Sequence, residues 1–544
     1  MSDLAIHPSS LIRRAAALHA DREAIVRQGE RLTYGGLAAR TDALAAALGA
    51  AGLAPGARVA LLGRNNLGYA VGLLALGRRG FAAVPLNWRL GAQALTATAA
   101  KYAPEGLLYT RDFAATADAL RAALGSIRAA VCVDAPDADL PTPEAAAAWV
   151  AASARPPRRD DVFAYISTGG TEGVPKGVIV TNAMLEACVV TMLAAEPVHA
   201  DDVTLVLPQM FHNPHLYVVG PLLVGGKLVV PDMPSFDAEL VLRTIEAEGV
   251  TRFLGVATMM NYLLDAQDRI GADLHTLRTI SYGGAPFSPR LIERLLDVFG
   301  CDLMQLYGQT ETSVLVSTLR PEDHRAALAD PALRHRLESA GRPAPLVEAR
   351  VVDDDGRDVP HDRSAVGEIV VRAPSVMTAY FDDPERTAEK LRDGWCHTGD
   401  LATWDGDGYL YIVDRRNDLI ISGGENVFPS AVEAVIRELD AVDDVVVIGV
   451  PDEVWGQVVT AVVLPRAGQN VSADQVSALC NERLARYMRP RVVHVVDELP
   501  KNASGKVLRA EVKQRYAAPS STSSNGMSSP TVTSASNVRP QPPQ

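Results

Sequence analysis

The chain has 544 residues, of which 48% are hydrophobic and 22% are charged, and its formal net charge at pH 7 is −13. This length exceeds what a single hydrophobic core supports, so we expect at least two packed units of an ordinary globular protein. The excess of acidic residues argues against a general electrostatic attraction to nucleic acid.

The cysteines are scattered and include no C-x-x-C pair; they are Cys132, Cys188, Cys301, Cys396 and Cys480. This spacing supports neither structural zinc nor a disulfide framework, and it favours a reduced, cytoplasmic setting. Residues 1–7 lack the basic start and apolar run of a signal peptide. The apolar stretch at residues 218–230 is interrupted by glycines, a proline and a lysine. We therefore expect a soluble protein without a membrane span.

The first two thirds of the chain alternate between strand and helix patterns. Helical spacing occurs at residues 11–20, 37–51, 67–79, 238–248 and 289–299. Short apolar runs typical of buried strands occur at residues 59–62, 81–84, 204–208, 227–230, 253–256 and 279–281. This alternation predicts an α/β fold in which helices cover mostly parallel sheets.

Three segments follow other patterns. The Ala-, Pro- and Asp-rich residues 134–161 predict a surface linker. Residues 348–372 alternate valine and isoleucine around Asp-Asp-Gly turns, which predicts an antiparallel β unit. From residue 418 onward, helical patterns at 430–439 and 473–487 combine with strand patterns at 445–450, 458–464 and 492–496. We expect this region to form a small α+β domain.

The last residues differ in composition from everything before them. Residues 518–544 consist mainly of Ser, Thr, Pro, Asn and Gln, so they cannot bury enough apolar surface to offset the entropy cost of ordering. The expected organisation is a large domain at residues 1–416, a small mobile domain at 417–517 and a disordered tail at 518–544. A functional peptide motif in the tail is the alternative.

A glycine-rich loop stands out within the run Tyr165-Ile-Ser-Thr-Gly-Gly-Thr-Glu-Gly-Val-Pro-Lys-Gly-Val178. Glycines let backbone N–H groups approach phosphate oxygens, Thr168 and Thr171 add hydroxyl donors, and Lys176 adds a cation. This chemistry suits the triphosphate of ATP. The spacing is not that of a P-loop, and a plain surface connection is the alternative for the motif taken alone.

Further motifs follow in order: Tyr282-Gly-Gly-Ala-Pro286, Tyr307-Gly-Gln-Thr-Glu311, Trp395-Cys-His-Thr-Gly-Asp400, Asp414-Arg415, Ser422-Gly-Gly-Glu-Asn426 and Pro500-Lys-Asn-Ala-Ser-Gly-Lys506. Together with the loop they resemble the class I adenylate-forming superfamily, which includes acyl-CoA synthetases, adenylation domains and luciferases. The resemblance covers nearly the whole chain. It implies a large α/β domain joined to a small one by a hinge near residues 416–418.

The resemblance also implies roles for individual residues. Lys506 is expected to contact the carboxylate and the α-phosphate, with Thr310 on a phosphate oxygen and Glu311 on Mg²⁺, a metal that favours hard carboxylate ligands. Metal contact is expected from Thr171 as well. The ATP and AMP site is expected to comprise Thr168, Gly169, Gly170, Thr171, Gly173, Lys176, Gly284, Ala285, Pro286, Tyr307, Gly308, Asp400 and Arg415. Tyr307 would face adenine, whereas Asp400 and Arg415 would bind ribose.

The acyl and CoA side is expected to involve His212, Gly283 and Gly424. Gly424 would lie beside the pantetheine arm, with a plain turn as the alternative. His212 is interpreted as pocket lining and not as a catalytic base, because a lone histidine is more often structural. Glu172, Asn417 and Met488 depart from the commoner family pattern, so their effect on rate is left open.

The favoured function is an AMP-forming carboxylic acid:CoA ligase that uses ATP, Mg²⁺ and CoA and acts through an acyl-adenylate. The acyl pocket segments are mostly apolar without an obvious fixed cation, so a medium- or long-chain fatty acid and an aryl acid fit equally well. A free-standing adenylation enzyme that loads a carrier protein is the alternative. A third class, a nucleotide-binding protein without turnover, is disfavoured by the intact motifs. The oligomeric state is left open, with a homodimer as one alternative.

Overall fold

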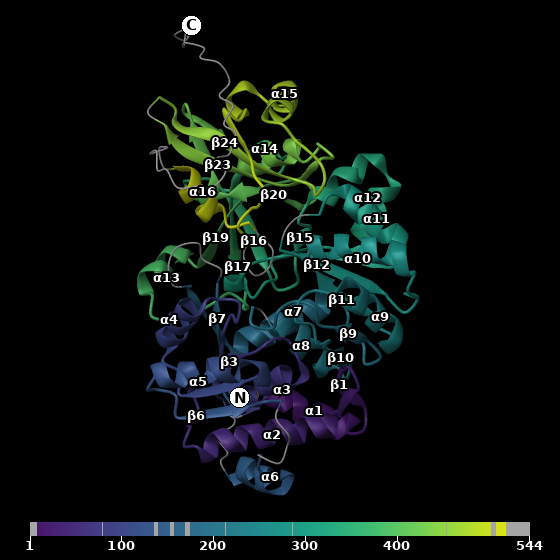
Figure 1. Cartoon of the computed structure of the whole chain (residues 1–544), viewed down its shortest axis with the longest axis vertical. Helices are drawn as coiled ribbons and strands as arrows, with labels where there is room; N and C mark the ends of the chain where they lie inside the picture. The colour runs from purple at the N-terminus through teal and green to yellow at the C-terminus, as the bar shows by residue number, and fades with distance from the viewer. Residues whose placement is uncertain are drawn as a thin grey trace.

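The computed structural model describes residues 8–78, 80–134, 140–152, 157–168, 175–212, 214–284, 287–452, 454–501 and 507–517. Within these residues the strands form four sheets that are covered and separated by helices (Figure 1). The predicted tail, residues 518–544, lies outside them. None of the helices in this described part combines the length and apolarity that a bilayer crossing needs.

The first sheet carries the glycine-rich loop. Its strands run in the order β6 (Ala129–Cys132), β5 (Gly106–Tyr109), β3 (Arg58–Leu62), β4 (Ala82–Pro85), β7 (Val162–Ser167) and β8 (Gly177–Thr181). All pairings are parallel except the last, in which β7 and β8 form an antiparallel hairpin around the loop. Strand β4 is buried along its whole length, as a parallel strand covered on both faces should be.

The second sheet is also parallel in its centre. Its strands run in the order β15 (Arg342–Pro343), β14 (Ser317–Leu319), β13 (Asp302–Tyr307), β12 (Thr279–Gly283), β11 (Arg252–Gly255), β9 (Val203–Leu205), β10 (Lys227–Val229), β1 (Glu23–Arg27) and β2 (Glu30–Thr33). Only the edge strands β2, β14 and β15 pair in the antiparallel sense. The carboxyl ends of β11, β12 and β13 therefore meet at one edge.

The other two sheets are smaller. One is antiparallel and contains β16 (Glu348–Val352), β17 (Gly367–Arg372), β19 (Trp395–Trp404), β18 (Leu391–Arg392) and β20 (Leu410–Arg415). The last lies in the C-terminal part of the chain and contains β22 (Glu425–Val427), β21 (Ile420–Ser422), β24 (Gly456–Pro465), β23 (Val442–Asp452) and β25 (Val492–Val495). The short 3₁₀ segment Arg416–Asp418 connects the two.

The helices of the N-terminal part are α1 (Pro8–His19), α2 (Tyr34–Ala50), α3 (Leu67–Arg78), α4 (Ala92–Tyr102), α5 (Ala114–Ala123), α6 (Pro143–Ala152), α7 (Asn182–Ala195) and α8 (Pro214–Leu223). Those that follow are α9 (Ala238–Glu248), α10 (Ala257–Ile270), α11 (Pro289–Phe299), α12 (Pro321–Ala329), α13 (Pro384–Lys390), α14 (Pro429–Ile436), α15 (Ala473–Arg483) and α16 (Arg509–Ala517). Side-chain oxygens of Thr33, Thr181 and Asp237 cap the first turns of α2, α7 and α9.

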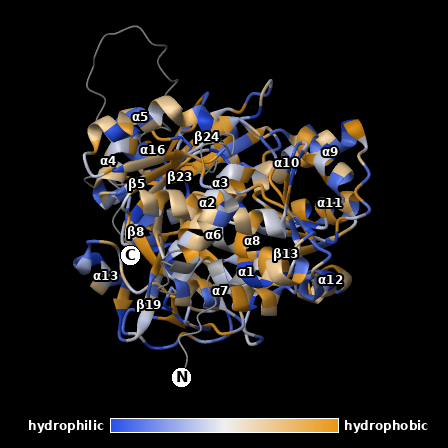
Figure 2. Ribbon diagram, turned by 90° about the horizontal axis from the view of Figure 1, so that it is seen from below, coloured by the Kyte–Doolittle hydropathy of each residue, from blue (hydrophilic) through white to orange (hydrophobic). Residues whose placement is uncertain are grey.

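Figure 2 shows hydrophobic residues along interior strands such as β5 and β23, whereas outer helices such as α9 and α11 alternate polar and apolar faces. Helix α11 buries Ile292, Leu295 and Phe299, which lie on one side of the helix. The predicted α/β class, with mostly parallel sheets, a β unit and a small C-terminal α+β region, is confirmed.

The prediction of a plain surface linker at residues 134–161 is wrong. The segment contains helix α6, which packs against α2. The Trp149 ring lies so close to Gly49 that a Cβ atom there would be 1.6 Å from it. Alanines such as those of α6 occur in linkers as well, but they are good helix formers and let the helix lie close to its neighbour.

Candidate active site

A cavity of about 1260 Å³ lies where the two parallel sheets and the antiparallel sheet meet. Its wall includes Gly255 at the end of β11, Gly283 at the end of β12 and Gly308 just after β13. Ligands of open α/β sheets bind outside the carboxyl ends of the parallel strands, and this cavity occupies that position.

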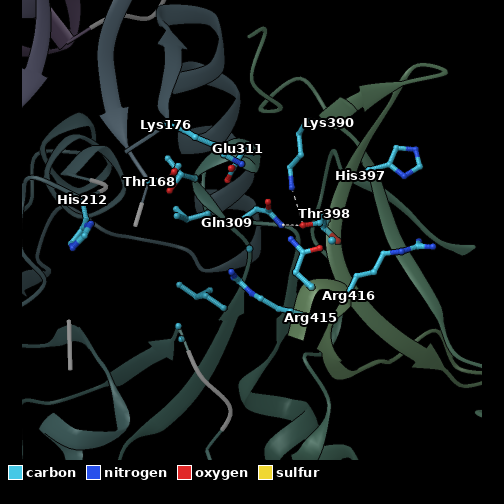
Figure 3. A pocket seen from close by; sticks show the side chains of 18 of the residues that line it. Thr168, Lys176, His212, Gln309, Glu311, Lys390, His397, Thr398, Arg415 and Arg416 are labelled. Carbon is cyan, nitrogen blue, oxygen red and sulfur yellow. Dashed lines mark hydrogen bonds between the residues drawn. The ribbon is translucent and has the colours of Figure 1, made fainter. Parts of the chain in front are cut away.

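Nine of the predicted site residues line this cavity: Thr168, Lys176, His212, Gly283, Gly284, Gly308, Thr310, Glu311 and Arg415. Figure 3 shows Thr168, Lys176 and Glu311 in one part of it, with His212 to one side and Arg415 to another. The other predicted site residues in the described ranges, Tyr307, Asp400 and Gly424, do not line it. Gly169, Gly170, Thr171, Gly173, Ala285, Pro286 and Lys506 lie outside the described residues.

The ends of the glycine-rich loop are held by the β7–β8 hairpin. The Thr168 N–H donates to the Lys176 carbonyl over 2.8 Å. The Lys176 ammonium lies 5.4 Å from the centre of the Tyr380 ring, and no carboxylate in the described ranges pairs with it. A cation without a carboxylate partner at the wall of a cavity is suited to an anionic ligand.

Glu311 lies on a single 3₁₀ turn, Thr310–Thr312, and is only 8% exposed. The Tyr380 hydroxyl donates to its Oε1 over 2.6 Å, and the Met377 N–H donates to its carbonyl oxygen over 2.8 Å. Its Oε2 accepts no hydrogen bond from any described residue. No group of three or more His, Cys, Asp or Glu that could hold a metal occurs in the described ranges. A lone carboxylate with one unbonded oxygen is the kind of donor that Mg²⁺ uses, since this metal takes few protein ligands and fills the rest from phosphate and water.

The chain folds back sharply after Glu311. Ser313 and Val314 have φ values of 52° and 64°, in the left-handed region that a β-branched residue seldom adopts. A Cβ atom at Gly308 would lie 2.4 Å from the Val314 carbonyl carbon, so only glycine fits beneath this turn. The Val314 side chain lines the cavity. Backbone strain of this kind is concentrated at functional sites.

Asp400 is 5% exposed and lies behind the cavity wall. The Tyr307 hydroxyl donates to its Oδ2 over 2.7 Å, and the Gln309 amide donates to the same oxygen over 3.4 Å. Arg415, its partner across the β19–β20 pairing, places Nε 3.3 Å from Oδ1. Burial and this carboxylate raise the pKa of Tyr307, which keeps its proton for donation. The predicted residues Tyr307, Asp400 and Arg415 thus form one connected group.

The opposite end of the cavity is largely apolar and is lined by Phe236, Leu254, Val256, Met259, Tyr262, Leu306 and Val314. The Phe236 and Tyr262 ring centres are 6.3 Å apart. Arg89, which lies outside the segments predicted to form the acyl pocket, also lines the cavity. The sequence carried no signal for this placement, because Arg89 follows β4 of the other parallel sheet.

His212 lines the cavity to one side of Thr168, Lys176 and Glu311 (Figure 3), and its Nε2 is buried without a hydrogen-bond partner in the described ranges. Burial, with the Arg89 guanidinium nearby, lowers the pKa of His212 from 6.5 to about 4. The ring is therefore neutral at pH 7, which suits a lining residue.

This pKa predicts a pH dependence of stability. Between pH 6.5 and about 4 the unfolded chain binds a proton at His212 that the folded chain excludes. The stability that the neutral ring contributes is therefore complete above pH 6.5 and is lost as the pH falls toward 4, by up to about 3 kcal/mol. His212→Gln should flatten the dependence of the free energy of unfolding on pH, measured with urea. The exposed His361→Gln serves as the control. An unchanged slope in His212→Gln would contradict this account.

Gly424 lies at a hairpin turn and not at the cavity. Ser422 pairs with Glu425, and Gly423 and Gly424 between them have φ values of 61° and 85°. Positive φ at both central residues is what a two-residue hairpin of type I′ requires. Leucine at position 424 would therefore strain the backbone, although a Cβ atom there meets nothing within 4 Å.

Asparagine tolerates positive φ and gives a cleaner test of the predicted pantetheine contact. We expect Gly424→Asn to keep its melting temperature and acid-dependent pyrophosphate release, while thioester formation from supplied acyl-AMP slows about ten- to a hundredfold. Gly468, with φ 76° and nothing within 4 Å of a Cβ atom, offers the matched control Gly468→Asn. Equal thioester rates in the two variants would remove Gly424 from the CoA site.

Two further cavity residues had no sequence prediction. Tyr380 contacts Glu311 and Lys176, and Lys390 of α13 donates to the Thr398 carbonyl over 2.8 Å. Neither belongs to one of the glycine-containing motifs. Tyr380 lies on a segment that pairs with Val178 of β8, and Lys390 ends α13, which packs against β19.

Comparison with known proteins agrees with this geometry. Residues 12–381 match the family described as AMP-binding enzyme, and residues 431–506 match the AMP-binding enzyme C-terminal domain. The chain is 39% identical to a feruloyl-CoA synthase from Amycolatopsis sp over 92% of this chain and 98% of that protein. It is 36% identical to an indoleacetate–CoA ligase from Aromatoleum aromaticum over 94% of this chain and 98% of that protein.

A solved structure of the O-succinylbenzoate CoA synthetase from Bacillus subtilis, in complex with AMP, has a TM-score of 0.79 and 29% identity, covering 92% of this chain and 98% of that one. The chain therefore belongs to the AMP-binding enzymes, the class I adenylate-forming superfamily, and within it to the acyl-CoA synthetases.

Proposed function

We propose that this enzyme joins an aryl carboxylic acid to CoA in two steps. The carboxylate attacks the α-phosphorus of ATP, which forms the acyl-adenylate and releases pyrophosphate. The CoA thiol then loses its proton and attacks the acyl carbon, which forms the thioester and releases AMP. Activation is needed because a carboxylate has no usable leaving group, whereas the adenylate has AMP.

The observation that carries this proposal is the composition of the single cavity. Its polar end holds Lys176, Glu311 and Arg415, which suit a nucleotide, and its apolar end suits an organic acid. Gly283 and Gly308 line the same cavity at the carboxyl ends of β12 and β13, and we propose that an acid and an α-phosphate lie together beside them. Holding two reactants side by side makes a reaction that would be bimolecular in solution effectively unimolecular, which lowers the entropy cost of reaching the transition state.

For the first step, Lys176 and Thr168 would bind phosphate oxygens at the loop, and Thr310 would donate to another. Arg415 and Asp400 would bind the ribose, with Tyr307 and Gln309 fixing the carboxylate orientation. Mg²⁺, when bound at Glu311, would neutralise charge on the phosphates. Lys506 is proposed to contact both the carboxylate and the α-phosphate, because two anions must approach each other.

For the second step, we propose a large domain at residues 1–416 and a small domain at 417–517 that rotates about Arg416–Asp418. In this structure Arg416 pairs with Asp354 and, over 3.4 Å, with Glu368. The Ser430 N–H donates to Asp414 over 2.9 Å. Polar contacts of this kind around the connection can exchange partners at low cost.

The substrate class follows from the apolar end and from the relatives. Phe236 and Tyr262 offer aromatic faces at the rim, and offset or tilted rings stabilise aromatic ligands. Two relatives that align over nearly the whole chain are named for aryl acids, feruloyl-CoA synthase and indoleacetate–CoA ligase. An aryl acid is thus favoured over a medium- or long-chain fatty acid, and CoA over a carrier protein.

The experiment is a panel of ferulate, indoleacetate, octanoate and palmitate, each assayed for CoA thioester formation with ATP and Mg²⁺. We expect the highest kcat/KM for one of the two aryl acids. Higher values for both fatty acids would contradict the aryl assignment. Acid-dependent pyrophosphate release without any CoA thioester would instead support the carrier-protein alternative.

A further inference from the structure

Tyr380 contacts two charged residues of the cavity wall, Glu311 and Lys176. It is 3% exposed, its hydroxyl donates to Glu311 Oε1 over 2.6 Å, and its ring centre lies 5.4 Å from the Lys176 ammonium. A neutral phenol that donates to a carboxylate forms a short, charge-assisted hydrogen bond. An ammonium over a tyrosine ring is attracted by the ring's negative face.

The backbone around Tyr380 is hydrogen-bonded to β8, the strand that follows the glycine-rich loop. Val178 of β8 and Tyr380 form an antiparallel bridge. The Ile179 N–H donates to the Ala379 carbonyl over 3.1 Å, and the Phe381 N–H donates to the Gly177 carbonyl over 2.7 Å. Residues 379–381 thus pair with the start of β8 in the β7–β8 hairpin, immediately after the glycine-rich loop.

The residues before Tyr380 are hydrogen-bonded to the turn that carries Glu311. The Met377 N–H donates to the Glu311 carbonyl, and the Ser313 hydroxyl donates to the Ser375 carbonyl over 2.7 Å. Residues 375–381 therefore form a strap between the loop that carries Lys176 and the turn that carries Glu311. Tyr380 is the strap residue whose side chain contacts both.

We propose that Tyr380 is a positioning residue for adenylation. Its hydroxyl holds Glu311 Oε1, so that Oε2 is directed to the metal–nucleotide complex, while its ring holds the Lys176 ammonium beside the same phosphates. This inference rests on the proposed function of the site. Tyr380 coordinates nothing itself, and its effect is transmitted through Glu311 and Lys176.

Two substitutions separate the contribution of the Tyr380 hydroxyl from that of its ring. In Tyr380→Phe the ring stays and the hydroxyl is lost, so ATP affinity without Mg²⁺ should be unchanged. The increase in ATP affinity on adding Mg²⁺, measured by calorimetry, should fall about tenfold, the size expected for a hydrogen bond to a charged group. Tyr380→Leu removes the ring as well and should also weaken ATP binding without Mg²⁺. Thioester formation from supplied acyl-AMP should stay unchanged in Tyr380→Phe.

The chain offers a matched control in Tyr409, which is 2% exposed and donates to Asp323 over 2.6 Å outside the cavity. Tyr409→Phe should lower the melting temperature without changing the Mg²⁺ effect on ATP binding. A double variant gives the decisive comparison: once Glu311→Gln is present, Tyr380→Phe should add no further loss of the Mg²⁺ effect.

A wild-type Mg²⁺ effect in Tyr380→Phe, or full additivity with Glu311→Gln, would overturn the proposal. Failure of the proposed function would show differently, as wild-type enzyme that releases no pyrophosphate with any acid.

Discussion

Lys506→Ala is expected to abolish acid-dependent pyrophosphate release while leaving thioester formation from supplied acyl-AMP largely intact. In the proposed mechanism the cationic side chain acts while the carboxylate and the α-phosphate approach each other, and it has no role once they are joined. Loss of one electrostatic contact of this kind in the transition state lowers the rate about a hundred- to a thousandfold. Both half-reactions should be measured by quenched assays on the same preparation.

Lys501 of the same motif provides the control. It is exposed and pairs with Asp444 of β23 over 2.8 Å. Lys501→Ala should leave both half-reactions close to wild type, because exposed ion pairs contribute little. An equal loss in both half-reactions of Lys506→Ala would contradict the role given to Lys506, since it would indicate a general defect.

Asp400→Ala is expected to raise KM for ATP roughly ten- to more than a hundredfold. Hydrogen bonds to a charged group contribute about 1.5–3 kcal/mol, and this carboxylate is proposed to accept from the ribose. The change also leaves the Tyr307 hydroxyl and the Arg415 guanidinium without their partner. The melting temperature should therefore fall as well, because a buried donor loses its acceptor.

A matched substitution at Asp323 separates the effect of Asp400→Ala on ATP binding from its effect on stability. It is 6% exposed and accepts from the Tyr409 hydroxyl, which is the same chemistry away from the cavity. Asp323→Ala should lower the melting temperature but leave KM for ATP unchanged. If both variants raise KM equally, the ATP effect of Asp400 comes from lost folding and not from the ribose.

The strands that could be predicted from the sequence are those marked by a pattern within a few neighbouring residues. The apolar runs at 253–256 and 279–281 correspond to β11 and β12, and parallel strands place their carboxyl ends at one edge. The places of two motif glycines could be predicted in the same way. Gly283 and Gly308 stand at the ends of strands, where a Cβ atom would lie 2.6 Å and 2.4 Å from backbone atoms.

Contacts between distant segments were not predictable from such signals. Tyr380 and Glu311 are separated by 69 residues and meet only because the strap crosses from one sheet to the turn after another. The hydrogen bond between Tyr307 and Asp400 likewise joins two different sheets, so the two residues were expected at the nucleotide without being expected to touch. Helix α6 was hidden because its alanines match both linker and helix composition.

The most direct test of the central claim follows one oxygen atom. An acid accepted by the enzyme is labelled with ¹⁸O in its carboxyl group and incubated with ATP, Mg²⁺ and CoA, and the products are examined by mass spectrometry. Attack of the carboxylate on the α-phosphorus, followed by thioester formation, requires one labelled oxygen in AMP, one in the thioester and none in pyrophosphate. Label in inorganic phosphate together with ADP formation, or AMP without label, would contradict the adenylate mechanism.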